Sequence, residues 1–205
     1  AFFRRQRQMC IRDRDKAGLL IEGYEELNTM ITWYHYPYQK EHLKKLGFSK
    51  LAEWVEYKIK IFSAEDAPEK VKKFSKIIQQ RYELKVLNFK SRKEIIPYVD
   101  KMFELLNVTY SNLQTYVTIK QYQIDFYKEK FIKYIHPDFI KCCLDKDDNL
   151  IAFLITMPSF SRALKKINGK MGLMGYLRLF KAQHFNDRVS LYLIGVDPKY
   201  QSKGV

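Results

Sequence analysis

The residues best suited to chemistry stand together in a short glycine-containing loop, Gln201, Ser202, Lys203, Gly204 and Val205. The loop follows an apolar, β-prone stretch at 189–196. A strand that runs into such a loop directs successive backbone N–H groups toward the point where a helix begins, and those groups bind phosphate oxygens. Glycine lets the backbone approach the anion closely, and a lysine adds positive charge. A loop with one glycine is also typical of an ordinary turn, so these residues alone leave both interpretations open.

Residues 193–205, Leu-Ile-Gly-Val-Asp-Pro-Lys-Tyr-Gln-Ser-Lys-Gly-Val, resemble the cofactor motif of the GNAT superfamily of acyl-CoA-dependent N-acyltransferases. That motif is an apolar strand ending in Val-x-Pro and a loop of the form Gln/Arg-x-x-Gly-x-Gly/Ala. Gln201 and Gly204 occupy its first and fourth loop positions, and the sixth falls after Val205. The resemblance implies that the co-substrate is acetyl-CoA or another acyl-CoA. It places Ile194, Gly195 and Val196 against the pantetheine arm. It assigns the pyrophosphate to the loop residues Gln201, Ser202, Lys203, Gly204 and Val205.

The elements that must position this loop are regular and closely spaced. From Leu84 onward the pattern predicts a strand at 84–89, a helix from Ser91, a helix at 118–135, paired strands at 139–144 and 150–157, a helical insertion at 158–186 and a strand at 189–196. We therefore expect an α/β (α+β) fold in which helices flank a mixed β-sheet. The superfamily resemblance implies a GNAT-like version of that sheet.

Capping signals and apolar periodicity define the helices around the sheet. Ser63 with Asp66, and Ser91 with Glu94, have the spacing of capping boxes. Two sets of apolar residues are expected to form inward faces, Val71, Phe74, Ile77 and Ile78 in one helix and Tyr122, Phe126 and Ile132 in another.

The front of the chain shows a second, shorter pattern. A helix at 38–46 ends at Gly47, and alternating residues at 52–62 predict a strand. This order resembles the closing helix, Gly-Phe corner and last strand of a GNAT repeat. Many GNAT enzymes carry a tyrosine acid four residues before that glycine, where this chain has Leu43. The resemblance therefore implies a catalytically silent first repeat.

Two incomplete tandem repeats are thus expected, the C-terminal part of one at 15–62 and the N-terminal part of the next at 63–205, cut within the pyrophosphate loop. Stretches 18–24, 36–38 and 46–48 also resemble a little-characterised group of bacterial tandem GNAT-like proteins. Residues 1–14 fit nothing that follows, and we expect them to be non-native or disordered.

The net charge and the cysteines indicate which partners and which cellular compartment to expect. The chain has 205 residues with 37 Lys+Arg against 23 Asp+Glu, a net charge of +14. Such a surplus draws a protein toward polyanions, but it is spread along the chain as solvated helix faces are, so nucleic acid is the less favoured partner. Cys142 and Cys143 are adjacent and Cys10 is distant, which predicts neither a disulfide nor a metal site. We expect a cytoplasmic protein with no membrane span.

The transfer reaction needs a deprotonated amine, a donor for the oxyanion and an acid for the thiolate. Tyr192, Asp187 and Asp197 are candidates for the acceptor side, although core packing and turn formation explain them more simply. An aromatic cluster of Tyr34, His35, Tyr36 and Tyr38 suits either an acceptor pocket or a packed loop. The catalytic residues stay unknown at this level.

The expected function is transfer of an acyl group, most simply acetyl, from acyl-CoA to a small-molecule or peptide amine. A FemABX-like aminoacyltransferase that uses aminoacyl-tRNA is the alternative enzyme, and the net charge suits it. A catalytically silent GNAT-like binding module is the third hypothesis, because a fold does not establish an activity.

Overall fold

A computed structural model describes residues 18–30, 32–61, 63, 65–113, 116–131 and 136–205. The chain forms two compact units. A sheet unit comprises Val55–Met157 and Leu191–Val205, and a helical unit combines the N-terminal residues through Trp54 with Pro158–Ser190. These units do not follow the expected boundary between 62 and 63, because the insertion at 158–190 groups with the front of the chain. The two units are described separately.

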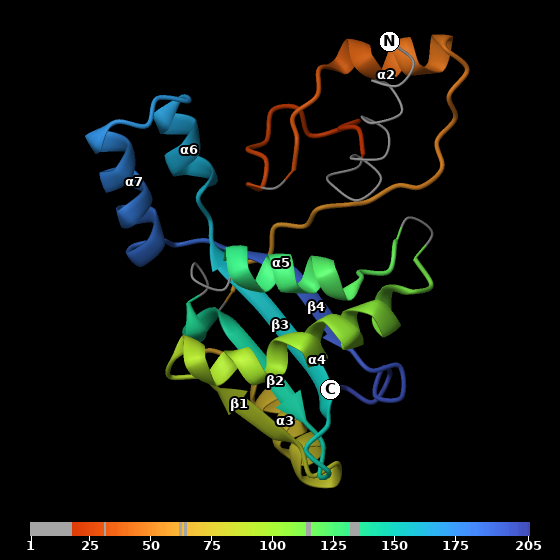
Figure 1. Ribbon diagram of the computed structural model, residues 1–205, viewed down its shortest axis with the longest axis vertical. Coiled ribbons are helices and arrows are strands. Elements are labelled where there is room, and N and C mark those ends of the chain that lie inside the picture. Colours follow the sequence, from red (N-terminus) through yellow and green to blue (C-terminus); the bar gives the residue numbers. More distant parts are fainter. Residues whose placement is uncertain (1–17, 31, 62, 64, 114–115, 132–135) are drawn as a thin grey trace. The chain divides into compact units, whose positions relative to one another are not determined.

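Four strands form one sheet in the order β1-β2-β3-β4 (Figure 1). They are β1 (Lys85–Asn88), β2 (Ile140–Leu144), β3 (Leu150–Pro158) and β4 (Val189–Val196). β1 pairs antiparallel with β2, and β2 with β3. Beside β4, the amide of Asp197 donates to the Ile151 carbonyl at 2.8 Å, so the end of β4 meets the start of β3. The predicted α/β (α+β) class is confirmed, with an antiparallel sheet in place of the mixed sheet expected.

Helix α4 (Arg92–Tyr110) packs on this sheet and forms the core with it. Its buried residues are Ile95, Val99, Met102, Leu105 and Leu106, and they meet Ile140, Cys142, Leu144 and Phe153 from the strands. Ser91 is the N-cap residue, as predicted, and Glu94 accepts hydrogen bonds from the Ser91 hydroxyl and the Lys90 amide. The helix therefore begins where the capping signal placed it.

The adjacent cysteines lie on opposite faces of β2. Cys142 points into the core and is 1% exposed, whereas Cys143 is half-buried, and both are free thiols. Burial raises the pKa of the Cys142 thiol to about 12. A thiol that stays protonated is a poor nucleophile, so Cys142 serves the core.

Helix α5 (Gln121–Phe131) packs beside α4 through an unexpected face. Ile124 is its buried residue, the Tyr127 ring stacks on Phe103, and Lys128 pairs with Asp100 at 2.8 Å. The expectation that Tyr122 and Phe126 face inward is wrong, because both side chains are more than half exposed. Ile132, the third member of that set, lies outside the described residues.

Helix α3 (Glu69–Arg81) also turns its apolar face differently from the prediction. Val71, Phe74 and Ile77 are more than half exposed, and the half-buried member of the set is Ile78. The Ser63 hydroxyl does bond Asp66, but this closes a separate turn, since the helix begins at Glu69 after Pro68. The helix is amphipathic as predicted, but of the four apolar residues expected to face inward, Ile78 alone is half-buried.

The β2–β3 hairpin turns at Asp145, as its turn chemistry predicted. The carboxylate of Asp145 accepts hydrogen bonds from the Asp147 amide, the Asn149 amide and the Asn149 side chain at 2.9, 2.9 and 3.2 Å. Burial acts to raise the pKa of this carboxyl, but these hydrogen bonds outweigh it and the pKa is lowered. The turn thus holds a carboxylate in its ionised form.

The helical unit contains α2 (Pro37–Lys45), α6 (Ser161–Ile167) and α7 (Leu173–His184). Helix α2 ends before Gly47, whose φ of +83° favours glycine, as the sequence predicted. Helices α6 and α7 form a hairpin (Figure 1).

The expectation of a strand at 52–62 is wrong over its described residues 52–61, which form no strand and are exposed. Phe62 lies outside the described residues, as do 1–14.

Candidate functional site

The glycine loop is built on Asp197, the residue directly after β4. The carbonyl oxygen of Asp197 accepts hydrogen bonds from the amides of Tyr200 and Gln201 at 2.8 and 3.1 Å, and its carboxylate accepts one from the Lys199 amide at 2.8 Å. Asp197 therefore acts as a turn residue, which the sequence favoured over a role on the acceptor side. Its three bonds fix the direction in which the loop leaves the strand.

Gln201 returns its side chain to the strand. Its Nε2 donates to the Val196 carbonyl oxygen at 3.0 Å. The predicted role of Gln201 was to line a pyrophosphate cradle, whereas its amide and side-chain nitrogens both bond protein oxygens at the end of the strand. In this structure Gln201 fastens the loop to β4.

The following residues leave backbone amides available. Ser202 and Gly204 have φ of +62° and +82°, which interrupts regular backbone bonding. Within the described chain, the amides of Ser202, Gly204 and Val205 donate to no protein acceptor. The φ of Gly204 favours glycine, and a Cβ there would also lie 2.8 Å from Cδ1 of Ile78 in α3, whose side chain would have to shift. Three amides in four residues can hold an anion.

Lys203 is held between two aromatic rings. Its Nζ lies 5.5 Å from the centre of the Tyr82 ring and 4.9 Å from that of Tyr200, and the two rings meet edge to face at 6.3 Å. Such contacts attract a cation by about 0.5–1 kcal/mol at exposed sites. Burial raises the pKa of Tyr200, and the carboxylates of Asp145 and Asp197 add to that effect.

The predicted pantetheine-binding residues lie on the outer strand, where helix α4 already contacts two of them. Tyr110 donates its hydroxyl to the Ile194 carbonyl at 2.9 Å, and Thr109 donates to the Val196 carbonyl at 3.4 Å. Gly195 is buried, and a Cβ there would lie 2.5 Å from the Phe153 ring. Close packing against Phe153 therefore explains the glycine at position 195, in addition to any role in binding.

The other candidates each have local contacts of their own. Tyr192 has a buried hydroxyl without a protein partner among the described residues, and burial raises its pKa. Asp187 pairs with Arg162 at 3.3 Å in the helical unit. His136 accepts from the Asp138 amide and begins a short 3-10 helix, η2 (Pro137–Phe139). The Nδ1 of His184 lies 3.0 Å from the Phe180 carbonyl.

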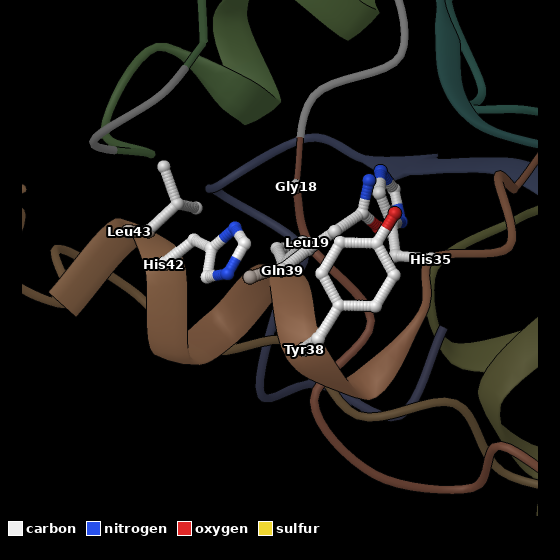
Figure 2. A pocket seen from close by; sticks show the side chains of 7 residues that line it. All are labelled: Gly18, Leu19, His35, Tyr38, Gln39, His42 and Leu43. Carbon is white, nitrogen blue, oxygen red and sulfur yellow. The ribbon is translucent and has the colours of Figure 1, made fainter. Parts of the chain in front are cut away.

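A hollow of about 610 Å³ opens in the helical unit beside α2. Gly18, Leu19, His35, Tyr38, Gln39, His42 and Leu43 line it (Figure 2). Its lining contains no lysine, arginine or carboxylate among the described residues. Of the predicted aromatic cluster, His35 and Tyr38 reach the hollow, while Tyr34, Tyr36 and Tyr38 contact one another ring to ring and are exposed. The polar side chains that it offers are His35, His42, Tyr38 and Gln39.

Several residues around the loop were missed by the sequence. Ile78 of α3 and Tyr82, which follows α3, contact the loop, and Thr109 and Tyr110 of α4 contact the strand before it. No local spacing marks them, because their partners lie far along the chain. Within the described residues, no three His, Cys, Asp or Glu side chains are grouped to hold a metal ion. None of the helices in the described part combines the length and apolar character that a bilayer crossing needs.

No family model matches the chain, and no solved structure matches it. The chain is similar to Protein YghO of Escherichia coli (strain K12), with 21% identity over 168 residues. The aligned part is 80% of this chain and 41% of YghO, so the chain spans about two fifths of the length of this curated relative.

Proposed function

We propose that this chain carries the co-substrate loop of a GNAT-type N-acyltransferase that transfers an acyl group, most simply acetyl, from acyl-CoA to an amine. The observation that carries the proposal is the row of amides at Ser202, Gly204 and Val205, which donate to no acceptor among the described residues at the exit of β4. A pyrophosphate needs such donors and a nearby cation, which Lys203 supplies. The likeness of residues 193–205 to the GNAT motif supports the same assignment.

The residues fit the diphosphate better than they fit the pantetheine arm. Pairing of pantetheine amides with β4 needs free carbonyl groups, and the carbonyls of Ile194 and Val196 already accept hydrogen bonds from α4. A carbonyl oxygen has two lone pairs, so a ligand amide can share the Ile194 carbonyl with Tyr110, whereas the Val196 carbonyl already accepts from both Thr109 and Gln201 and must lose one of them. Binding of the arm should therefore compete with Tyr110 and Thr109.

In the proposed reaction, the amine nitrogen attacks the thioester carbonyl carbon and a C–N bond forms. The C–S bond then breaks, the thiolate leaves and takes a proton, and the amine loses one. The loop contributes binding and orientation, which hold the reacting thioester in place. The proposal gives no residue of this chain the role of acid or base.

The test is calorimetric titration of acetyl-CoA into this chain and into the protein encoded by the whole reading frame that contains it. Gly204→Asp should abolish binding, because a side chain at this positive φ strains the loop against Ile78 and its carboxylate adds a negative charge beside the proposed phosphate site. Gly47→Asp is the matched control, since Gly47 has nearly the same φ, +83° against +82°, and lies in the other unit. Circular dichroism verifies that both variants fold. Equal binding by wild type and Gly204→Asp, or no binding by either wild-type protein, would contradict the proposal.

The net charge of +14 keeps one alternative in view, an aminoacyltransferase that uses aminoacyl-tRNA. Phosphate contacts to a nucleic acid release counterions, so its affinity falls steeply with salt. Tight tRNA binding with a steep salt dependence, together with no binding of acetyl-CoA, would favour this alternative.

A further inference from the structure

Helix α7 has two unlike apolar faces. One face packs in the helical hairpin through Gly175, which is buried, and through Leu179 and Ala182, which are half-buried. A Cβ on Gly175 would lie 3.4 Å from the Lys170 carbonyl oxygen and 3.7 Å from Cγ1 of Ile167. These are ordinary van der Waals distances, so Gly175 lies in contact with the segment around α6, and packing explains this face.

The opposite face is apolar and exposed. Its side chains are Leu173, Tyr176, Leu177 and Phe180, which are 79, 62, 53 and 59% exposed. At about 100° per residue, these four fall within an arc of about 100° that lies roughly opposite Gly175 and Ala182. An apolar arc of this width is what a helix uses to face an apolar phase.

Positive charge surrounds this exposed face. Residues 158–190 contain seven Lys or Arg and one carboxylate, Asp187, which is paired with Arg162. Lys181 flanks the apolar arc on the same helix, and Lys170 precedes the helix. The segment therefore presents Leu, Phe and Tyr side chains among cations.

The hairpin is held in shape by its own contacts. Arg178 donates to the Lys166 carbonyl oxygen at 2.8 Å, which ties α7 to α6. At its base, the Ser159 amide donates to the Arg188 carbonyl oxygen at 2.9 Å, and Asn186 donates to the carbonyls of Ser159 and Ala182. The exposed face is preorganised, so docking does not have to order it first.

From these observations we propose that the α6–α7 hairpin docks the protein on an anionic phospholipid surface. The apolar arc of α7 enters the boundary between headgroups and acyl chains, and the surrounding cations contact the lipid phosphates. A helix with this arrangement lies in the interface and does not span the bilayer. A nucleic acid would use the cations but not the exposed Leu and Phe side chains. This inference does not depend on the proposed acyl transfer.

Co-sedimentation of the chain with lipid vesicles tests the proposal. One vesicle type is an equimolar mixture of phosphatidylglycerol and phosphatidylcholine, and the other is pure phosphatidylcholine. The wild type should bind the first far more strongly. Lys170→Gln and Lys181→Gln should each weaken that binding by about fivefold, since each removes one cation near the surface. Leu173→Ser combined with Phe180→Ser should weaken it by at least about tenfold.

Leu51→Ser is the matched control, because Leu51 is 70% exposed in the same unit and lies outside any helix or strand. It should bind like the wild type. The proposal is overturned if the wild type sediments with neither vesicle, or if the serine double variant binds as the wild type does. Loss of binding in Leu51→Ser equal to that of the double variant would also overturn it, as would RNA binding without vesicle binding.

Discussion

The hydroxyl of Tyr110, the last residue of α4, donates a 2.9 Å hydrogen bond to the carbonyl oxygen of Ile194 on β4, 84 positions later in the chain. Thr109 makes a similar bond to the carbonyl of Val196. The outer edge of a sheet presents unpaired backbone groups that attract other chains or ligands. The end of α4 therefore already bonds two backbone carbonyls of the strand to which the pantetheine arm is proposed to bind.

Tyr110→Phe removes this hydrogen bond and keeps the ring. The free energy of unfolding should fall by about 1 kcal/mol, the usual net value of one such bond. If acetyl-CoA uses this edge as proposed, its affinity should rise by about fivefold, because the Ile194 carbonyl becomes available. Urea denaturation and calorimetry measure the two effects. A fall in affinity would show that the hydroxyl assists binding.

Gly195→Ala should destabilise the sheet. The new Cβ would meet the buried Phe153 ring at 2.5 Å, so the ring or the strand must shift, at a cost of about 1–3 kcal/mol. Phe153→Leu combined with Gly195→Ala should lose less than the sum of the two single losses, since the smaller side chain makes room. Thermal and urea denaturation of the four proteins complete the cycle. Additive losses would refute the close contact as the cause.

Asn107 joins α4 to the segment before α5. Its Nδ2 donates to the Ile119 carbonyl at 3.0 Å, and its Oδ1 accepts from the Ile119 amide at 2.9 Å and from the Tyr116 hydroxyl. Asn107→Asp keeps the acceptors and loses the donor, so we expect a loss of about 1–2 kcal/mol. Asn107→Ala removes all three bonds and should cost more. Equal losses in denaturation experiments would mean that the acceptor bonds add nothing.

Asp145→Asn tests the pH dependence of the β2–β3 turn. The folded-state pKa of this carboxyl is lowered, so its contribution to stability is present above the pKa of the unfolded chain and is lost as pH falls through the folded value. The variant should be less stable by about 1 kcal/mol at about pH 7, and the difference should shrink at about pH 3. Asp147→Asn is the control, since Asp147 is exposed in the same turn and its side chain makes no ion pair among the described residues. A difference that does not change with pH would contradict this account.

Local patterns predicted the elements whose partners are near in sequence. The β2–β3 hairpin, with its turn at Asp145, and the strand at 189–196 follow from alternation and turn chemistry, and the structure confirms them. The stretch 52–61 has the same alternation, yet it forms no strand, and the sheet found among the described residues does not include it. Alternation indicates that a segment is able to pair, whereas pairing depends on the whole fold.

Helix faces and site contacts show the same limit. The apolar periodicity of α3 and α5 was visible, but which side becomes buried depends on the neighbouring elements, and Phe74 and Phe126 stay exposed. At the loop, the sequence indicated Gly204 and Lys203 by type and spacing. It could not indicate Ile78, Tyr82 or Tyr110, because tertiary packing alone brings these residues to the loop and its strand.

The hydrogen bond between Ser159 and Arg188 closes the neck of the α6–α7 hairpin, where the chain leaves β3 and returns to β4. The entropy lost in closing a loop grows slowly with its length, by about 0.6 kcal/mol for each doubling. Neighbouring strands whose connection is closed at its base by such a hydrogen bond therefore tolerate connecting segments of very different length. We therefore expect that a tight turn can replace the α6–α7 hairpin without disrupting the pairing of β3 with β4. By the same reasoning, the hairpin could be grafted onto another antiparallel strand pair to carry its surface there.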